Sequence, residues 1–249
     1  MIKAFILRRY WLIRHRPIVT LSFMFIFPLL IHFFVTIVLK NVLVNSLEQI
    51  PYDIWVFPGI LLLIAAITAN AVIYRDLFDL RVHQRAFLPL TLAPFSKTQL
   101  ILGFLVISAI EATFYVLVAM GVLNFFLPKT LSALDYFMIL VFTPIFIFIL
   151  GNILITFSLL IDRITTYLST ILVLFLIILF GSGVLVELEF YPKTISLILS
   201  NLPLSMILYS LRDIIFSNRV DWTQIFIPIF VAIIWTWFNG FLLKRKLNQ

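Results

Sequence analysis

The sequence contains no cysteine, so the chain can form no disulfide, thiol nucleophile or cysteine metal site. Charge is also scarce, because Asp, Glu, Lys and Arg make up 12% of the 249 residues against roughly 25% in soluble domains. The alternation of apolar and polar residues that is typical of a transmembrane barrel is missing as well. The chain instead has 63% hydrophobic residues, gathered in solid runs. These features predict an all-α integral membrane protein, because a helix satisfies its own backbone groups in lipid.

Six apolar runs are each long enough to cross about 30 Å of hydrocarbon at about 1.5 Å per residue. A basic amphipathic stretch, residues 1–17, precedes the first run and is typical of an interfacial helix rather than of a cleavable signal peptide. We therefore expect one transmembrane domain over residues 1–249 with six transmembrane helices. The predicted spans are Ile18–Leu39, Ile54–Ile73, Leu100–Leu127, Tyr136–Ile161, Tyr167–Val186 and Ile225–Leu243.

The basic residues divide unequally between the two sides of this predicted membrane domain. Cytoplasmic segments carry an excess of Lys and Arg, so the basic side predicts that both termini are cytoplasmic. The net charge of +7 then reflects membrane topology, and we expect no nucleic-acid partner. All 18 basic residues fall on the side of the N-terminus except Lys40, Lys129, Lys193, Arg212 and Arg219.

The connection before the last span, residues 187–222, is apolar but broken. Its pieces Thr194–Leu199 and Leu202–Leu211 are each far shorter than the ~20 residues that a crossing needs, and Pro203 disfavours helix at the residue before it. One interpretation is two short re-entrant helices that dip into the outer leaflet, packed against other spans because irregular backbone at that depth needs surrounding protein. The other is an amphipathic helix that lies flat on the outer surface.

Nucleotide and metal motifs are missing from the sequence. None of the seven glycines begins a G-x-x-x-x-G-K-[ST] loop, and the three histidines, His15, His32 and His83, are too far apart for a common zinc spacing. We therefore expect no catalytic residue, no metal site and no cofactor bound by this chain.

The first long cytoplasmic connection, residues 74–99, contains a D-x-x-D pair, Asp76 and Asp79, one helical turn apart. The pair allows three interpretations. It could bind the magnesium of a lipid diphosphate, as in aspartate-rich membrane prenyltransferases, although the sequence holds no second such motif. It could belong to a solvated helix with local salt bridges to Arg75 and Arg81. It could also belong to a helix that inserts into a groove on a partner protein.

Glu111 lies in the third predicted span, near the bilayer centre. Ionisable groups at that depth cost roughly 2.5–3.5 kcal/mol on insertion scales and are candidates for function. Glu111 either is a protonated acid hydrogen-bonded to a neighbour such as Thr113 or Asn70, because desolvation disfavours the carboxylate, or it lines a path or a subunit interface.

Taken in order, the motifs resemble the ABC-2 type permeases, the membrane subunits of one class of ATP-binding cassette exporters. The family pattern after the fifth span is matched by Ser182-Gly183, Pro192, Leu202-Pro203-Leu204 and Arg212. The family's cytoplasmic loop is matched by Arg75-Asp76, Ala93-Pro94-Phe95-Ser96-Lys97 and Gly103. The sequence departs from that loop at Val82-His83-Gln84-Arg85, where members commonly carry glycine and threonine.

The resemblance implies a permease that works as a homodimer in a bacterial plasma (inner) membrane, with two ATPase subunits that bind ATP and magnesium. Residues 74–99 would hold the coupling helix, and residues 187–222 would close the outer end of the path. The implied function is export of an amphipathic or lipid-linked substrate, such as a polysaccharide, lipid or drug-like molecule. A membrane enzyme acting on lipid diphosphates and a proton-driven transporter using Glu111 remain the alternatives. The implied ATPase-coupling residues are Arg75, Asp76, Asp79, Arg81 and Arg85, and the implied outer gate is Gly183, Pro192, Pro203 and Arg212.

Overall fold

The computed structural model describes residues 2–15, 17–47, 49–82, 95–128 and 130–247. Within these ranges the chain is helical, and the only β-type pairing is an isolated bridge between Asn45 and Pro51. Residues 83–94 of the predicted coupling loop, Arg85 among them, lie outside the described residues. The prediction of an all-α fold is confirmed for the part of the chain that is described.

Among the described residues, six helices are long and apolar enough to cross a membrane, as predicted. The first span, Thr20–Lys40, runs through α2 (Pro17–Ile31), the π-helical turn η1 (His32–Thr36) and α3 (Ile37–Lys40). The others are built on α4 (Tyr52–Ile73), α7 (Lys97–Leu123, extended by η3, Asn124–Phe126), α8 (Ala133–Leu160), α9 (Ile164–Gly181) and α12 (Trp222–Leu247).

The second span is longer than predicted. Its helix continues past Ile73 through the π-helical turn η2 (Tyr74–Asp79) and α5 (Leu80–Val82). No glycine or proline interrupts this stretch, and Leu77 and Phe78 are completely buried in the bundle. The predicted boundary at Tyr74 is therefore wrong, and the first third of the predicted cytoplasmic loop is bundle helix.

The third span begins three residues earlier than predicted, at Lys97. Ser96 precedes it as a capping box, because its hydroxyl accepts from the backbone N–H of Gln99 while the Gln99 side chain accepts from the Ser96 N–H. This reciprocal arrangement satisfies two backbone donors at the helix start.

Helix α4 is the centre of the bundle, and 83% of the residues in the most apolar stretch of its span are buried. It packs against α7 and α8, and α12 covers those two helices from another side. In the first span and in α9, only 22% of the residues of the most apolar stretch are buried, so most of their apolar side chains face outward. Apolar faces of this kind suit contact with lipid or with a second subunit, since a helix in lipid satisfies its backbone hydrogen bonds internally.

A polar seam joins α8 to α12 inside the bundle. The Asn152 amide donates to the Thr236 hydroxyl at 3.0 Å, and the Asn239 amide donates to the Asn152 side-chain oxygen at 2.9 Å. At Gly240, α12 comes so close to α7 that an added Cβ would lie 2.5 Å from the Thr98 hydroxyl. Small residues and interhelical hydrogen bonds are how membrane helices associate without a hydrophobic driving force.

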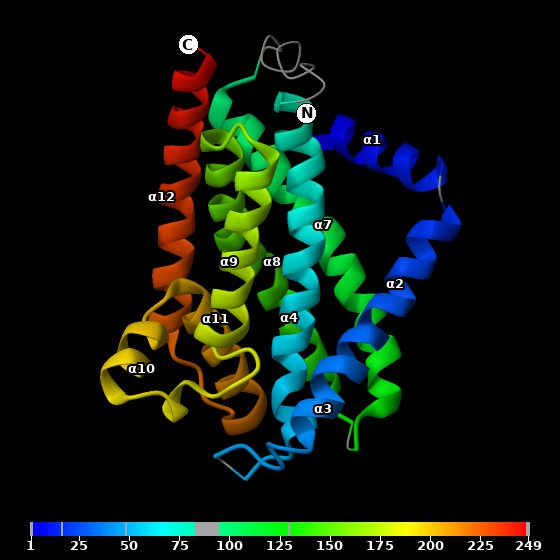
Figure 1. The fold of residues 1–249 in the computed structure, drawn as a ribbon, viewed down its shortest axis with the longest axis vertical. Coiled ribbons are helices and arrows are strands. Elements are labelled where there is room, and N and C mark those ends of the chain that lie inside the picture. Colours follow the sequence, from blue (N-terminus) through cyan, green and yellow to red (C-terminus); the bar gives the residue numbers. More distant parts are fainter. Residues whose placement is uncertain (1, 16, 48, 83–94, 129, 248–249) are drawn as a thin grey trace.

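Two elements depart from the bundle axis. Figure 1 shows α1 (Ile2–His15) lying across the direction of the other helices, with α2 running back obliquely toward α4. At the opposite end, α10 (Lys193–Ser200) and α11 (Pro203–Arg212) meet at an angle of 89°. Both chain termini lie toward the upper end of the molecule in Figure 1, as an even number of spans requires.

The two short helices before the last span differ in burial. Helix α10 has no buried residue, whereas α11 buries seven and packs against α12, α8 and α4. Pro203 occupies the first turn of α11, where its missing N–H costs nothing, and Pro192 immediately precedes α10. The predicted break near Asn201 and Leu202 is confirmed, and α11 is packed into the bundle whereas α10 is not.

Candidate functional site

At the end of the bundle that carries α10, Arg212 is buried, with 5% of its surface exposed. Its guanidinium donates to three backbone carbonyls: Nε to Trp55 at 3.2 Å, Nη1 to Gly183 at 2.6 Å and Nη2 to Val184 at 3.2 Å. The guanidinium carbon also lies 3.5 Å from the centre of the Trp55 ring, a cation–π contact. We call this group the outer clamp, after the side on which the distribution of basic residues predicts it to lie; it ties α11 to α4 and to the turn after α9.

Two glycines make the outer clamp possible. Gly183 has φ +77°, a left-handed conformation that costs other residues roughly 1–2 kcal/mol. Gly59 lies under the clamp, where a Cβ would come within 2.8 Å of the Val184 carbonyl oxygen and 3.0 Å of Arg212 Nη2. The structure therefore brings the sequence-predicted residues Gly183 and Arg212 into direct contact, and it adds Gly59 and Trp55, which the sequence analysis missed.

Acidic side chains lie beside the outer clamp. A cavity of about 260 Å³ beside Arg212 is lined by Glu187, Glu189 and Asp213, among others. The Glu187 carboxylate accepts from the backbone N–H of Leu47, at 3.0 and 3.1 Å. This contact fastens the loop after the first span to the segment that follows α9. The Arg212 charge is thus balanced by carbonyl dipoles and nearby carboxylates.

Near the other end, a second cluster joins α1 to the bundle. Arg9 Nε lies 2.6 Å from a Glu111 carboxylate oxygen, and Arg9 Nη2 lies 3.6 Å from Asp76. Arg8 and Arg75 also pair with Asp76, at 3.6 and 3.5 Å. We call these five residues the inner cluster. It links α1, η2 and α7, three elements that are far apart in the sequence.

The partner of Glu111 differs from the two that were predicted. The Thr113 hydroxyl donates to the backbone carbonyl of Ala109, and the Asn70 amide oxygen accepts from Tyr167. Glu111 pairs instead with Arg9 of α1. The sequence prediction missed this contact because it placed α1 along the membrane surface and not against α7.

The D-x-x-D pair is divided by the fold. Asp76 is 3% exposed and faces three arginines, whereas Asp79 is half-buried. The interpretation of the pair as part of a solvated helix is wrong for Asp76. Among the described residues no group of three or more histidine or acidic side chains could hold a metal ion, and the carboxylate of Asp76 is committed to the inner cluster.

Arg81, the other predicted coupling residue of this helix, points to a different part of the chain. It donates to the Asp162 carboxylate and to the backbone carbonyl of Ile161, between α8 and α9. Lys246, at the end of α12, reaches the same carboxylate at 3.3 Å. The hydrogen bond from Arg81 is the main cause that lowers the pKa of the Asp162 carboxyl below its ordinary value. Asp162 therefore joins three helix ends, a role that no local motif signals.

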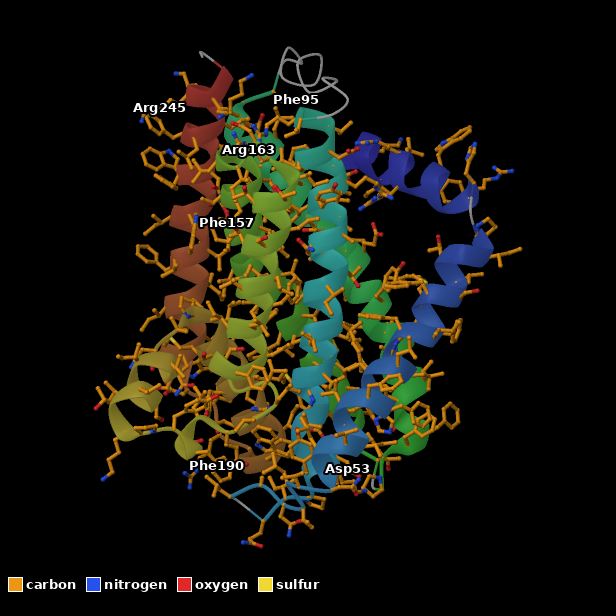
Figure 2. All side chains as sticks on the ribbon, viewed as in Figure 1. Asp53, Phe95, Phe157, Arg163, Phe190 and Arg245 are labelled. Carbon is orange, nitrogen blue, oxygen red and sulfur yellow. The ribbon has the colours of Figure 1, made fainter. Side chains whose placement is uncertain are left out.

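Figure 2 shows how the two ends differ. Arg163, Arg245 and Phe95 lie at the upper end, whereas Asp53, beside α3, and Phe190, near α10, lie at the opposite end. The inner cluster belongs to the upper half of the molecule and the outer clamp to the lower half. Of the sequence-predicted site residues, Arg75, Asp76 and Glu111 come together, and Gly183 and Arg212 come together. Pro192 and Pro203 lie at the starts of α10 and α11.

Comparison of the chain with protein-family models, with curated proteins and with solved structures found no match.

Proposed function

We propose that this chain is the membrane subunit of an ATP-driven exporter of the ABC-2 type. It would work as a homodimer with two ATPase subunits and carry an amphipathic or lipid-linked substrate outward across a bacterial inner membrane. In this proposal both termini and the helix ends around Asp162 are cytoplasmic, and α10 and α11 lie on the outer side. The resemblance of the sequence motifs and the arrangement of the helices support it together.

The observation that carries the proposal is the bent pair α10–α11 and its attachment. A pair of short apolar helices meeting at 89°, too short to cross singly and held to the bundle by a buried arginine, suits a plug at the outer end of a path. Non-helical backbone at membrane depth needs protein around it, and α11 has that protein on three sides. A re-entrant placement follows from the proposal.

The contacts of Arg81 suggest how movement would pass from an ATPase to the bundle. Arg81 lies at the end of the second span and within the predicted coupling loop, residues 74–99. Its hydrogen bonds reach the turn between α8 and α9. A push on the loop would therefore reach α8, α9 and, through Lys246, α12. Rigid-body rocking of packed helices is one established way in which such a push opens a path.

The alternatives have less support. An enzyme of lipid diphosphates would need Asp76 free to bind magnesium, but this carboxylate is buried among arginines. A proton-driven transporter would use Glu111 as its carrier, yet the Glu111 carboxylate is held in an ion pair with Arg9.

The test is reconstitution with an ATPase that co-purifies with this chain. The chain alone should not hydrolyse ATP, and the complex in vesicles should. Replacing Arg81 with alanine should uncouple hydrolysis from the permease. The matched control is Arg163→Ala, because Arg163 is exposed and directly follows Asp162, the partner of Arg81. Failure of any Walker-type ATPase to co-purify, together with full transport in a proton gradient without ATP, would overturn the proposal.

Orientation is tested separately with single cysteines, because the natural chain has none. Lys193→Cys on α10 should react with an impermeant maleimide only from outside, and Arg245→Cys only from the cytoplasm; both positions are exposed. The opposite pattern would invert the proposed direction of transport.

A further inference from the structure

A cavity of about 220 Å³ lies where α1, α2, α4 and α7 approach one another. This volume far exceeds the ~10–15 Å³ that one water needs. Its polar walls come from Arg9, Thr20, Arg75, Glu111 and Tyr115, and its apolar wall includes Phe23 and Ile67. The cavity is therefore polar on the side of the inner cluster and apolar on the side of α2.

The inner cluster carries an excess of positive charge. Three arginines, Arg8, Arg9 and Arg75, face two carboxylates, Asp76 and Glu111. One positive charge is thus left without a negative partner among these five residues. Arg8 and Arg75 are partly exposed, with 38% and 44% of their side-chain surface accessible, whereas Arg9 is buried. An uncompensated charge is costly at a buried position, so the cluster can accommodate one further negative charge beside Arg9.

The arginine at the centre of the cluster also has unused donors. Arg9 is 7% exposed, and none of its three side-chain nitrogens has a hydrogen bond of good geometry to any described residue. Nε and Nη2 approach carboxylates as ions, whereas Nη1 has neither an ion pair nor a hydrogen bond among them. A guanidinium offers five N–H donors in a planar fork, and the ligand that matches this fork best is a carboxylate or a phosphate.

We propose that this cavity binds the phosphate group of an anionic glycerophospholipid, with Arg9 and Arg75 as its ligands. The phosphate supplies the missing negative charge and accepts from Arg9. Its acyl chains lie along α2, where Leu21, Phe23 and Phe25 are about half exposed. An anionic lipid fits better than a zwitterionic one, because a choline headgroup would return a positive charge to the cluster.

A membrane lipid also explains the surroundings of the cavity better than free phosphate does. Helix α1 exposes Ile6, Leu7, Tyr10 and Trp11 beside the cluster, an apolar and aromatic surface of the kind that interfacial helices bury in the headgroup region. The cavity therefore opens where lipid headgroups are present at high local concentration. The inference does not depend on ATP-driven export, since the lipid is a resident ligand that holds α1 to α7.

The test is native mass spectrometry of the full chain in mild detergent with equal amounts of phosphatidylglycerol and phosphatidylcholine. The natural protein should retain one phosphatidylglycerol several-fold more often than phosphatidylcholine. The double variant Arg9→Gln with Glu111→Gln keeps the net charge and removes the ion pair together with the guanidinium, and it should lose this preference. The control Arg14→Gln lowers the net charge by one at an exposed position of the same helix and should retain the preference.

Equal retention of the two lipids by the natural protein, or an unchanged preference in the double variant, would overturn the proposal. A third arm adds inorganic phosphate alone and measures thermal unfolding. If phosphate stabilises the protein as well as phosphatidylglycerol does at the same concentration, the site binds a soluble anion and the lipid assignment is wrong.

Discussion

Arg9 and Arg212 are both more than nine-tenths buried, yet the protein treats them in opposite ways. Arg212 donates every side-chain nitrogen to a backbone carbonyl, and it stacks on Trp55. Arg9 faces only carboxylates, and its N–H groups lack good hydrogen bonds to described residues. Backbone carbonyls cannot leave without unfolding the chain, whereas carboxylates on other helices can separate. The comparison indicates a fixed outer clamp and an adjustable inner cluster.

The largest expected effect comes from removing the outer clamp with Arg212→Leu. Buried carbonyls of the turn after α9 lose their donor, at roughly 1–3 kcal/mol for each unsatisfied group, so we expect a loss of about 2–4 kcal/mol in stability. Thermal unfolding in detergent measures it. Arg219→Leu removes an exposed arginine from the same outer segment and should change the unfolding temperature little. Equal unfolding temperatures for the two variants would show that the clamp is not structural.

A second way to break the outer clamp leaves Arg212 in place. In Gly59→Ala the new methyl group lies 2.8 Å from the Val184 carbonyl oxygen, and overpacking of this kind typically costs about 1–3 kcal/mol. Gly121→Ala is the matched control, because nothing lies within 4 Å of its Cβ and alanine favours helix by roughly 1 kcal/mol. The two variants should therefore shift the unfolding temperature in opposite directions. A shift of the same sign in both would contradict the close approach at Gly59.

The energetic contribution of the contact between Arg9 and Glu111 in the inner cluster is tested by a double-mutant cycle. Arg9→Gln alone leaves Glu111 short of a partner, and Glu111→Gln alone increases the excess of positive charge. The losses in unfolding free energy of the two single variants should together exceed the loss in the double variant. The difference is the coupling energy, which should be roughly 0.5–3 kcal/mol, as contacting residues show. Urea or detergent unfolding of the four proteins measures it. Strictly additive effects would mean that the 2.6 Å contact contributes nothing.

The smallest expected effect concerns pH and the Asp162 junction. Because Arg81 lowers the pKa of Asp162 in the folded protein below the ordinary value of 3.8, the contribution of Asp162 to stability is present above about pH 4 and is lost as the pH falls below it. Asp162 is mostly exposed, so the effect is at most about 1 kcal/mol. The difference in unfolding temperature between the natural protein and Asp162→Asn should be present at neutral pH and vanish in acid. A difference that persists in acid would mean that the asparagine perturbs packing.

Some features of the fold could be predicted because they depend on local composition. The six spans follow from apolar runs, and the break between α10 and α11 follows from Pro203. In contrast, the charge of residues 74–82 predicts a cytoplasmic connection after the second span, whereas the structure shows that the helix of this span continues through them. Its charged residues point to partners on α1 and beside α9, which no local pattern indicates.

The sequence by itself determined that this protein crosses the membrane as helices, because a chain so apolar and so poor in charge can satisfy its backbone only in that way. It also singled out Asp76, as part of a D-x-x-D pair, and Glu111, as a charge within an apolar run, while Gly183 and Arg212 were indicated by the resemblance to the ABC-2 type permeases. The tertiary structure alone decided the partners: Arg212 with the carbonyls of Gly183, Val184 and Trp55, and Arg9 with Glu111. Ion pairs and carbonyl clamps join residues about 30 to 160 positions apart, and such contacts exist only after the helices have packed.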